Sequence, residues 1–235
     1  MKALIADLIV DIPEVGDLLY RCKDYLYEGK ECADIIIRTD LFSPEEKPEI
    51  NIKLYTYLKS GALYYRQLLK FGGMMLHASA VEIHGKVYLF SGNCGVGKST
   101  HTRLWQTVYR EEAHVINDDK PALRLIDGIW YAYGTPWCGK DAININAKAP
   151  VAGICFLKQS DKNFIRRLSP KAAIPKIFLQ TTRRLQSKEE LELMISHVDQ
   201  LVRKIPIFEF ENRPEPAAAY LSYETMRRAA EELGL

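Results

Sequence analysis

A glycine-rich run near the middle of the chain constrains the fold more than any other feature. The run fits the pattern G-x-x-x-x-G-K-[ST], and its residues are Gly92, Asn93, Cys94, Gly95, Val96, Gly97, Lys98, Ser99 and Thr100. An apolar segment, Val87–Ser91, precedes the run, and a helical pattern, Thr100–Val108, follows it. A strand, a glycine-rich loop and a helix in this order predict a phosphate-binding loop within an α/β fold.

The residue types in this run suit phosphate chemistry. Glycines let successive backbone N–H groups converge on a phosphate, which we expect to be the β-phosphate of a nucleotide. Lys98 can reach the oxygens of the β- and γ-phosphates, and the hydroxyl of Ser99 is a ligand for Mg²⁺. Cys94 is interpreted as a small side chain in a loop that works through its backbone. We therefore predict that Gly92–Thr100 binds ATP, or another nucleoside triphosphate, together with Mg²⁺.

Composition narrows the class of protein and of partner. The 235 residues are 47% hydrophobic and 26% charged, which is typical of a globular protein rather than a disordered one. A net charge of +2 gives no overall reason to expect nucleic acid or an anionic membrane as partner. The five cysteines show no Cys-x-x-Cys spacing, so neither a disulfide framework nor a zinc site is indicated. Because the sequence has no signal-peptide pattern and no apolar run of membrane-spanning length, a cytoplasmic location is expected.

The sequence pattern divides the chain into a front region and a core. Residues 1–72 are expected to form a small β-rich N-terminal region with a linking helix over residues 51–71, and they include a turn-rich stretch, Phe42–Pro48. Residues 73–235 are expected to form the core that carries the phosphate-binding loop. Beyond the loop, the pattern predicts a buried strand over Val151–Lys158 and a helix that begins with a capping box at Ser187 and Glu190. A short strand, Ile207–Phe210, and a final helix, 216–233, complete the expected core.

The dipeptide His84-Gly85 allows one strand pairing to be worked out from the sequence. It predicts a two-residue hairpin turn between strands at 74–83 and 86–91, and such a turn pairs Ile83 with Lys86. Continuing this register residue by residue places His77 opposite Gly92. A histidine beside the mouth of a phosphate loop can contact the γ-phosphate, orient an acid or help to hold a metal. His77 is therefore a candidate catalytic residue.

The dipeptide Asp127-Gly128 predicts a second hairpin, and its register helps to place two neighbouring acids, Asp118 and Asp119. It joins strands at 122–126 and 129–133, and the same register brings Asp119 toward Pro136 and Asp118 toward Trp137. The segment Gly134–Lys140 is then expected to flank the two acids. A phosphate-loop enzyme needs an acid downstream of the loop to hold Mg²⁺, and a second acid can accept the proton of an attacking hydroxyl.

Taken together, these motifs resemble the catalytic domain of HPr serine kinase/phosphorylase. The resemblance is carried by Leu76–Val81, by the loop Gly92–Thr100 and by Val115–Asp119. The same segments are similar to the phosphate-loop region of ATP-dependent phosphoenolpyruvate carboxykinase. The resemblance implies a mixed α/β sheet around the loop, with a small β-rich N-terminal appendage.

The resemblance also implies roles for individual residues. His77 and Asp118 would form the proton-accepting pair, Asp119 and Ser99 would hold Mg²⁺, and Lys98 would bind the β- and γ-phosphates. The chain departs from the kinase pattern because it lacks a clear second, arginine-bearing signature, and because Gly134–Lys140 stands where an acidic loop is expected.

The function implied is an ATP-dependent kinase that phosphorylates a serine-type hydroxyl. The small front region looks like that of compact HPr kinase-like proteins, which implies a peptide, small protein or small molecule as acceptor. Related kinases assemble as oligomers, so the resemblance is also compatible with a homo-oligomer. Two alternatives stay open: carboxykinase-like chemistry on a small carboxylic acid, and a non-catalytic nucleotide-binding module that recruits a peptide.

Overall fold

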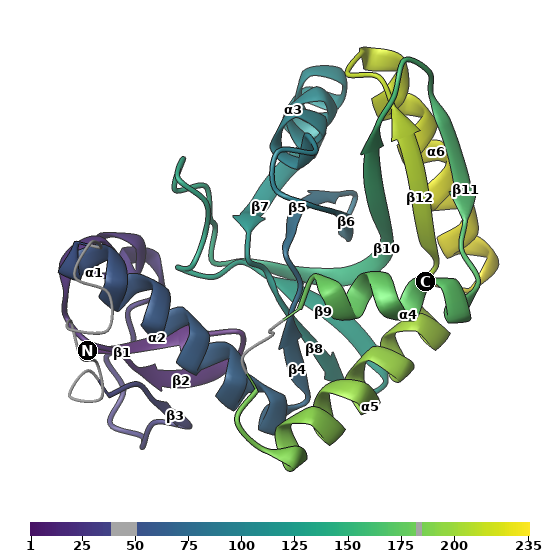
Figure 1. The fold of residues 1–235 in the computed structure, drawn as a ribbon. Coiled ribbons are helices and arrows are strands. Elements are labelled where there is room, and N and C mark those ends of the chain that lie inside the picture. The colour runs from purple at the N-terminus through teal and green to yellow at the C-terminus, as the bar shows by residue number, and fades with distance from the viewer. Residues whose placement is uncertain (39–50, 182–184) are drawn as a thin grey trace.

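The computed structural model describes residues 1–38, 51–181 and 185–235, and these form a mixed α/β fold (Figure 1). The predicted turn-rich stretch Phe42–Pro48 lies outside the described residues. The strands are β1 (Lys2–Ile5), β2 (Leu8–Asp11), β3 (Ile35–Ile36), β4 (Gly73–Met75), β5 (Ala78–Ile83), β6 (Lys86–Ser91), β7 (Ala113–Asp119), β8 (Ala122–Ile126), β9 (Ile129–Tyr133), β10 (Lys148–Gln159), β11 (Phe164–Arg167) and β12 (Ile207–Asn212). The α-helices are α1 (Gly16–Arg21), α2 (Ile52–Leu68), α3 (Lys98–Tyr109), α4 (Pro170–Leu179), α5 (Lys188–Lys204) and α6 (Pro216–Glu232).

The long strand β10 connects the two halves of the large sheet. Its first residues, 148–150, pair antiparallel with β9, whereas residues 151–156 pair parallel with β6. Its last residues, 154–159, also pair parallel with β12. The main path through the large sheet is β4-β8-β9-β10-β6-β5-β7, with β12 and then β11 attached beside β10. The expectation of a mixed α/β sheet is therefore confirmed.

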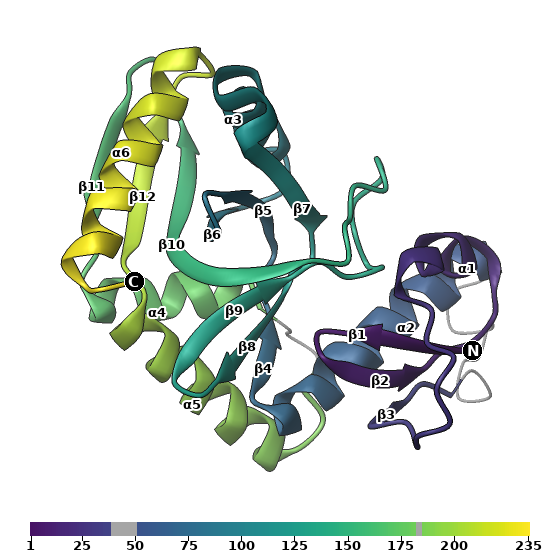
Figure 2. The same cartoon turned by 180° about the vertical axis from the view of Figure 1, so that it is seen from behind.

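Helices cover both faces of the parallel part of this sheet (Figures 1 and 2). Alternate residues of a strand point to opposite faces, and β6 shows this clearly. Phe90 packs in a buried cluster with Trp105 of α3 and Met226 of α6. Its neighbour Leu89 packs in a different cluster, with Ile177 of α4 and residues of α5. The loop that follows β6 is therefore held between two packed layers.

Both predicted hairpins are present in the predicted register. Ile83 pairs with Lys86, and Ile126 pairs with Ile129. The predicted single strand at 74–83 is wrong, because it is two strands with a break at Leu76 and His77. The first of them, β4, pairs with β8, whereas β5 pairs with β6 and β7. The break occurs because the His77 N–H donates to the carbonyl of Gln180, after α4, instead of to a neighbouring strand.

The N-terminal residues form a three-stranded sheet of their own, with order β1-β2-β3. The predicted linking helix is α2. The buried cluster under this small sheet also contains Tyr64 of α2, Tyr133 of β9 and Trp137 from the connection after β9. The front region and the large sheet therefore share a core, and a domain boundary at residue 72 stays a prediction.

Of the helices of the C-terminal half, α5 and α6 were predicted from the sequence, whereas α4 was not. Ser187 accepts a hydrogen bond from the backbone N–H of Glu190 at 3.1 Å, as the capping box predicts. The carboxylate of Glu190 accepts from the N–H of Gln186 instead of closing the box on Ser187. Leu191 and Ile195, which are apolar residues at helical spacing in α5, are exposed. No helix in the described ranges is both long and apolar enough to cross a membrane.

A prediction on stability concerns Gly61, in the middle of α2. A Cβ atom there would lie 2.7 Å from Cδ1 of Trp137, whose ring is stacked on Tyr64 with centroids 4.6 Å apart. Gly61→Leu should lower the free energy of unfolding by about 1–3 kcal/mol, which is typical of overpacking. Urea denaturation followed by circular dichroism measures this. Leu58→Ala, at an exposed position of the same helix, should stay within about 0.5 kcal/mol of the unmodified protein. An unchanged Gly61→Leu midpoint would show that this helix does not pack closely on Trp137.

Candidate functional site

The glycine-rich loop adopts the backbone geometry that its sequence predicts. Gly92, Gly95 and Gly97 have φ values of 141°, 79° and 101°, a region that side chains disfavour. Gly97 caps α3, which begins at Lys98, two residues earlier than the sequence pattern suggested. The first turn of a helix has free N–H groups, so the loop presents a site for an anion.

Lys98 lies across the loop that precedes it. Its Nζ donates to the carbonyl oxygens of Gly92 at 3.0 Å and Asn93 at 3.2 Å. Burial lowers the pKa of Lys98, and the nearby carboxylates of Asp119 and Asp118 partly offset this effect. The ammonium group of Lys98 therefore lies at the loop. Its hydrogen bonds to uncharged carbonyl oxygens can be replaced by hydrogen bonds to phosphate oxygens.

Ser99 and Asp118 form the first pair of polar side chains at the loop. The hydroxyl of Ser99 donates to both carboxylate oxygens of Asp118, at 3.1 Å and 2.9 Å. Asp118 is only 7% exposed. A hydroxyl and a carboxylate are hard oxygen donors, the type that Mg²⁺ prefers. These two residues therefore fit a magnesium ion, although no cluster of three or more His, Cys, Asp or Glu residues that could hold a metal occurs within the described ranges.

His77 and Asp119 form the second pair. Nε2 of His77 lies 3.0 Å from Oδ1 of Asp119, and Lys120 contacts the other carboxylate oxygen. Burial favours a higher pKa for Asp119, but the hydrogen bond from His77 and the charge of Lys120 outweigh it and hold the pKa well below its usual range. Asp119 also has a φ of 105°, which is strained for a residue with a side chain. The carboxylate of Asp119 is thus ionised and lies beside a histidine, while the backbone of the same residue adopts an unfavourable conformation.

Asp118 and Asp119 have exchanged the partners that the resemblance implied for them. It paired His77 with Asp118, and Asp119 with Ser99, whereas the structure brings Ser99 to Asp118 and His77 to Asp119. The reason is the register of β7 on β5. Asp118 pairs with Ser79, whose hydroxyl contacts Thr102 of α3 at 3.1 Å, so this face of the sheet looks toward the first turns of α3. Asp119 pairs with Ala78, the residue next to His77.

Gln180 joins the histidine to the loop, and the sequence reasoning missed it. Its side chain lies 2.9 Å from Nδ1 of His77 and 3.2 Å from Oδ1 of Asn93. Gln180 follows α4 and is buried. The amide oxygen Oε1 accepts from Nδ1 of the ring, and the NH₂ group donates to Asn93, so Gln180 fixes the orientation of the imidazole relative to the loop. No local pattern marks this glutamine, because the contact joins positions far apart in the chain.

A pocket of about 460 Å³ brings these groups together. Its wall opposite the loop is formed by Gly139, Lys140 and Asp141. The second hairpin is paired as far as Ala122 and Tyr133, and beyond the ladder the hydroxyl of Thr135 donates to the carbonyl of Lys120 at 3.0 Å. Beyond it the predicted approach of Asp118 to Trp137 is wrong, because the carbonyl of Asp118 accepts from the N–H of Gly139 instead. The segment Gly134–Lys140 therefore flanks the acids as expected, but shifted along the strand.

The front of the chain holds this wall in place. Nε1 of Trp137 donates to the hydroxyl of Ser60 at 3.1 Å, and the N–H of Cys138 donates to the hydroxyl of Tyr57 at 2.7 Å. Arg21, at the end of α1, donates to the carbonyl of Gly139 at 2.9 Å. The connection between β9 and β10 extends toward α1 and α2 in both ribbon views (Figures 1 and 2). The N-terminal region thus positions one side of the candidate site.

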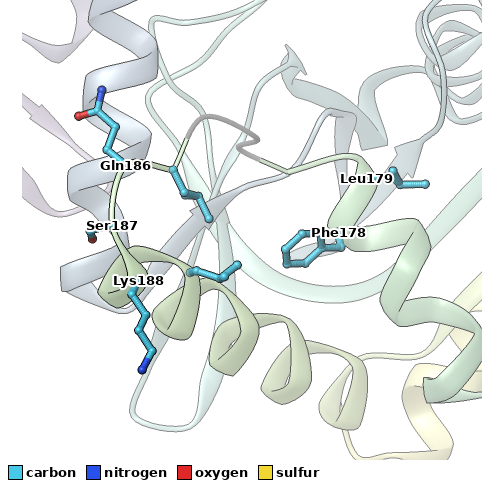
Figure 3. A pocket seen from close by; sticks show the side chains of 7 residues that line it. Phe178, Leu179, Gln186, Ser187 and Lys188 are labelled. Atoms are coloured by element: carbon cyan, nitrogen blue, oxygen red, sulfur yellow. The ribbon is translucent and has the colours of Figure 1, made fainter.

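A larger pocket, of about 640 Å³, lies between the end of α4 and the start of α5 (Figure 3). Phe178, Leu179 and Leu191 give it an apolar surface. Among the described residues that line it, Lys188 is the one ionisable side chain. Compared with this pocket, the pocket at the glycine-rich loop has more ionisable side chains, namely His77, Lys98, Asp118, Asp119, Lys140 and Asp141.

Comparisons with known proteins found no matching family model and no matching curated protein. Among solved structures, the chain is similar to the HPr(Ser) kinase/phosphatase from Coxiella burnetii, with 14% sequence identity. That match covers 67% of this chain and 95% of the other, with a TM-score of 0.37. The likeness is a distant one, and the function proposed below rests on the contacts of the site.

Proposed function

We propose that this protein is an ATP-dependent kinase that transfers the γ-phosphoryl group to a serine-type hydroxyl of a peptide, a protein or a small molecule. One observation supports this above all. A carboxylate kept ionised and oriented by a histidine, Asp119, lines the same pocket as the phosphate-binding loop. Strained backbone conformations cluster at functional sites, so a strained acid at that place favours transfer chemistry over nucleotide binding alone.

The proposed step is an in-line displacement at the γ-phosphorus. The acceptor oxygen forms a bond to phosphorus, the bond from phosphorus to the β,γ-bridging oxygen breaks, and ADP leaves. Asp119 takes the proton of the acceptor hydroxyl, and His77 holds the carboxylate in position. Lys98 turns from the loop carbonyls to the β- and γ-phosphate oxygens. When bound, Mg²⁺ at Ser99 and Asp118 neutralises charge on those oxygens.

The carboxykinase alternative finds little support in the pocket. Such chemistry needs arginines to bind a carboxylate substrate, but none of the described residues that line the pocket is an arginine. Arg103 contacts Asp141 at 2.6 Å, and Arg166 contacts Glu209 at 2.6 Å. Arg124 donates to the carbonyl oxygens of Ala6 and Phe71. These arginines serve the protein's own structure.

Lys98→Ala tests the phosphate loop. The variant should fold normally and lose nucleotide-dependent transfer, because the hydrogen bonds that Lys98 makes to described residues go to carbonyls of the loop itself and not to the core. Transfer from γ-labelled ATP to candidate peptides, small proteins and free serine measures this. Lys188→Ala, whose side chain is 89% exposed, is the matched control and should keep full activity. A Lys98→Ala protein that transfers phosphate at the unmodified rate would rule out the assignment of the loop.

The two acids can be separated by their dependence on Mg²⁺. Asp119→Asn should lower turnover by about 10²- to 10⁴-fold, the usual effect of losing a general base, with little change in the Mg²⁺ concentration required. Asp118→Asn should raise the Mg²⁺ requirement, because Asp118 contacts Ser99. Rates are measured across a Mg²⁺ titration, with Asp127→Asn, in a hairpin turn, as control. The reverse assignment of the two effects would contradict the proposed roles.

His77 should act through Asp119 rather than independently. His77→Ala is expected to lower turnover by about 10²- to 10⁴-fold while nucleotide affinity changes little. Because His77 contacts Asp119 at 3.0 Å, the double variant with Asp119→Asn should be no slower than the slower single variant. Effects that multiply in the double variant would show that the histidine has a separate task.

A further inference from the structure

The wall of the candidate site opposite the glycine-rich loop is a tight turn over residues 139–142. The N–H of Ala142 donates to the carbonyl of Gly139 at 3.1 Å, which closes the turn and leaves Lys140 and Asp141 at its tip. Gly139, Lys140 and Asp141 all line the pocket that contains His77 and the two acids. The tip of this turn is therefore part of the candidate site.

Both arms of the turn are attached to the backbone of Asp118. The N–H of Gly139 donates to the carbonyl of Asp118 at 2.5 Å, and the N–H of Asp118 donates to the carbonyl of Ile143 at 3.1 Å. A Cβ atom at Gly139 would lie 3.6 Å from Cβ of Asp119, so the turn also packs against the second acid. The position of the turn is thus set by the same end of β7 that presents the two acids.

The tip of the turn is also held to α3. Arg103 of this helix contacts Asp141 at 2.6 Å, and Ser99, four residues earlier, donates to the side chain of Asp118. Residues four apart lie on one face of a helix, so the turn lies beside the first two turns of α3. The first turn is also where the helix has free N–H groups for a phosphate. Lys140, which precedes Asp141, is thereby placed beside the proposed phosphate site.

Lys140 brings an uncompensated positive charge to this place. The residue is exposed, and its side chain makes no hydrogen bond or ion pair with any residue in the ranges 1–38, 51–181 and 185–235. Nearby cations are already engaged, since Lys120 contacts Asp119 and Arg103 contacts Asp141. The ammonium group of Lys140 is therefore available to a ligand in the pocket.

Phosphoryl transfer benefits from a cation on this side of the site. In the transition state, charge spreads over the oxygens of the γ-phosphoryl group, and a cation placed there lowers the barrier. Lys98 serves the phosphates from the loop, whereas the carboxylate of Asp119 adds negative charge where the acceptor attacks. No arginine occurs among the described residues that line the pocket. Lys140 is the lysine that lines it on the side of the acids.

We propose that Lys140 binds the oxygens of the γ-phosphoryl group during transfer, from the side opposite Lys98. The inference rests on the proposed kinase function and adds a catalytic residue to it. Because the backbone on both sides of Lys140 is held, only the flexible side chain has to move. The contact is made with the group in transfer rather than with bound ATP, so Lys140 acts on turnover and not on nucleotide affinity.

Binding of a mimic of the transferred group tests the proposal without knowledge of the acceptor. The full chain is mixed with Mg²⁺, ADP and tetrafluoroaluminate, whose planar fluoride arrangement resembles the phosphoryl group in transfer. Lys140→Ala should weaken binding of this mimic by about 10²- to 10³-fold, the usual effect of losing one stabilising group, and should leave the Kd of ATP within about threefold. Lys140→Arg should keep most of the affinity for the mimic. Lys188→Ala, whose side chain is 89% exposed, is the control and should bind like the unmodified protein.

Rates separate the γ-phosphoryl group from the acceptor as the ligand of Lys140. Lys140→Ala should lower turnover by the same factor with every acceptor and in the hydrolysis of ATP without acceptor, while the KM of the acceptor stays unchanged. A raised acceptor KM with unchanged ATP hydrolysis would overturn the proposal, because Lys140 would then bind the acceptor. Unchanged binding of the mimic, or an equal loss of affinity for ATP, would overturn it too. ATP that binds Lys98→Ala as well as the unmodified protein would instead mark a failure of the phosphate loop, and so of the proposed function itself.

Discussion

The pairing of β5 with both β6 and β7 is the constraint on which the candidate site depends. One neighbour, β6, runs directly into the phosphate-binding loop, and the other, β7, ends at Asp118 and Asp119. Because β5 lies between them, its starting residue sets the distance from the loop to the acids. His77, one residue before β5, is thereby placed next to Asp119. The backbone ladder therefore brings the loop, the histidine and the acids together.

Two unfavourable features occur in the part of the molecule that this pairing assembles. Asp119 has a positive φ, and the buried Asn212 Oδ1 has no partner. Each costs stability, at about 1–3 kcal/mol for such a strained conformation and a similar amount for an unpaired buried polar atom. Unpartnered buried polar atoms also occur in the packed interior, for example Nδ1 of His101 and Nε1 of Trp130. The other described non-glycine residues with positive φ have values of 49° to 58°, so it is the φ of 105° at Asp119 that distinguishes the candidate site.

The sequence predicted those parts of the site that depend on local chemistry. The glycines, the two-residue turns at His84-Gly85 and Asp127-Gly128, and the capping serine all act over a few residues, and the structure contains each of them. Counting back along the first hairpin placed His77 near the start of the loop, and the ladder is paired up to the neighbouring residue Ala78, opposite Ser91. The contact of His77 with Asp119 follows from the pairing of β5 with β7, which the sequence did not predict. The HPr kinase/phosphorylase-like assignment and the boundary at residue 72 remain predictions.

Contacts between distant segments explain what could not be read from the sequence. The assignment of the two acids depends on which face of β7 looks toward α3, and a pair of adjacent aspartates does not encode that. The break between β4 and β5 depends on the carbonyl of Gln180, which arrives from beyond α4. The wall of the pocket depends on Arg21 and α2, since Gly139 is held by the front region. Exposed Leu191 and Ile195 show that helical periodicity alone does not say how wide the buried face is.

The central claim is that Ser99 and Asp118 serve the metal while Asp119, held by His77, faces the group that is transferred. A crystal structure with Mg²⁺ and a non-hydrolysable ATP analogue tests it most directly. We expect the metal within direct or water-bridged reach of Ser99 and Asp118, and the γ-phosphate on the side of Asp119. A metal bound between His77 and Asp119, or a triphosphate bound away from Gly92–Thr100, would contradict the account.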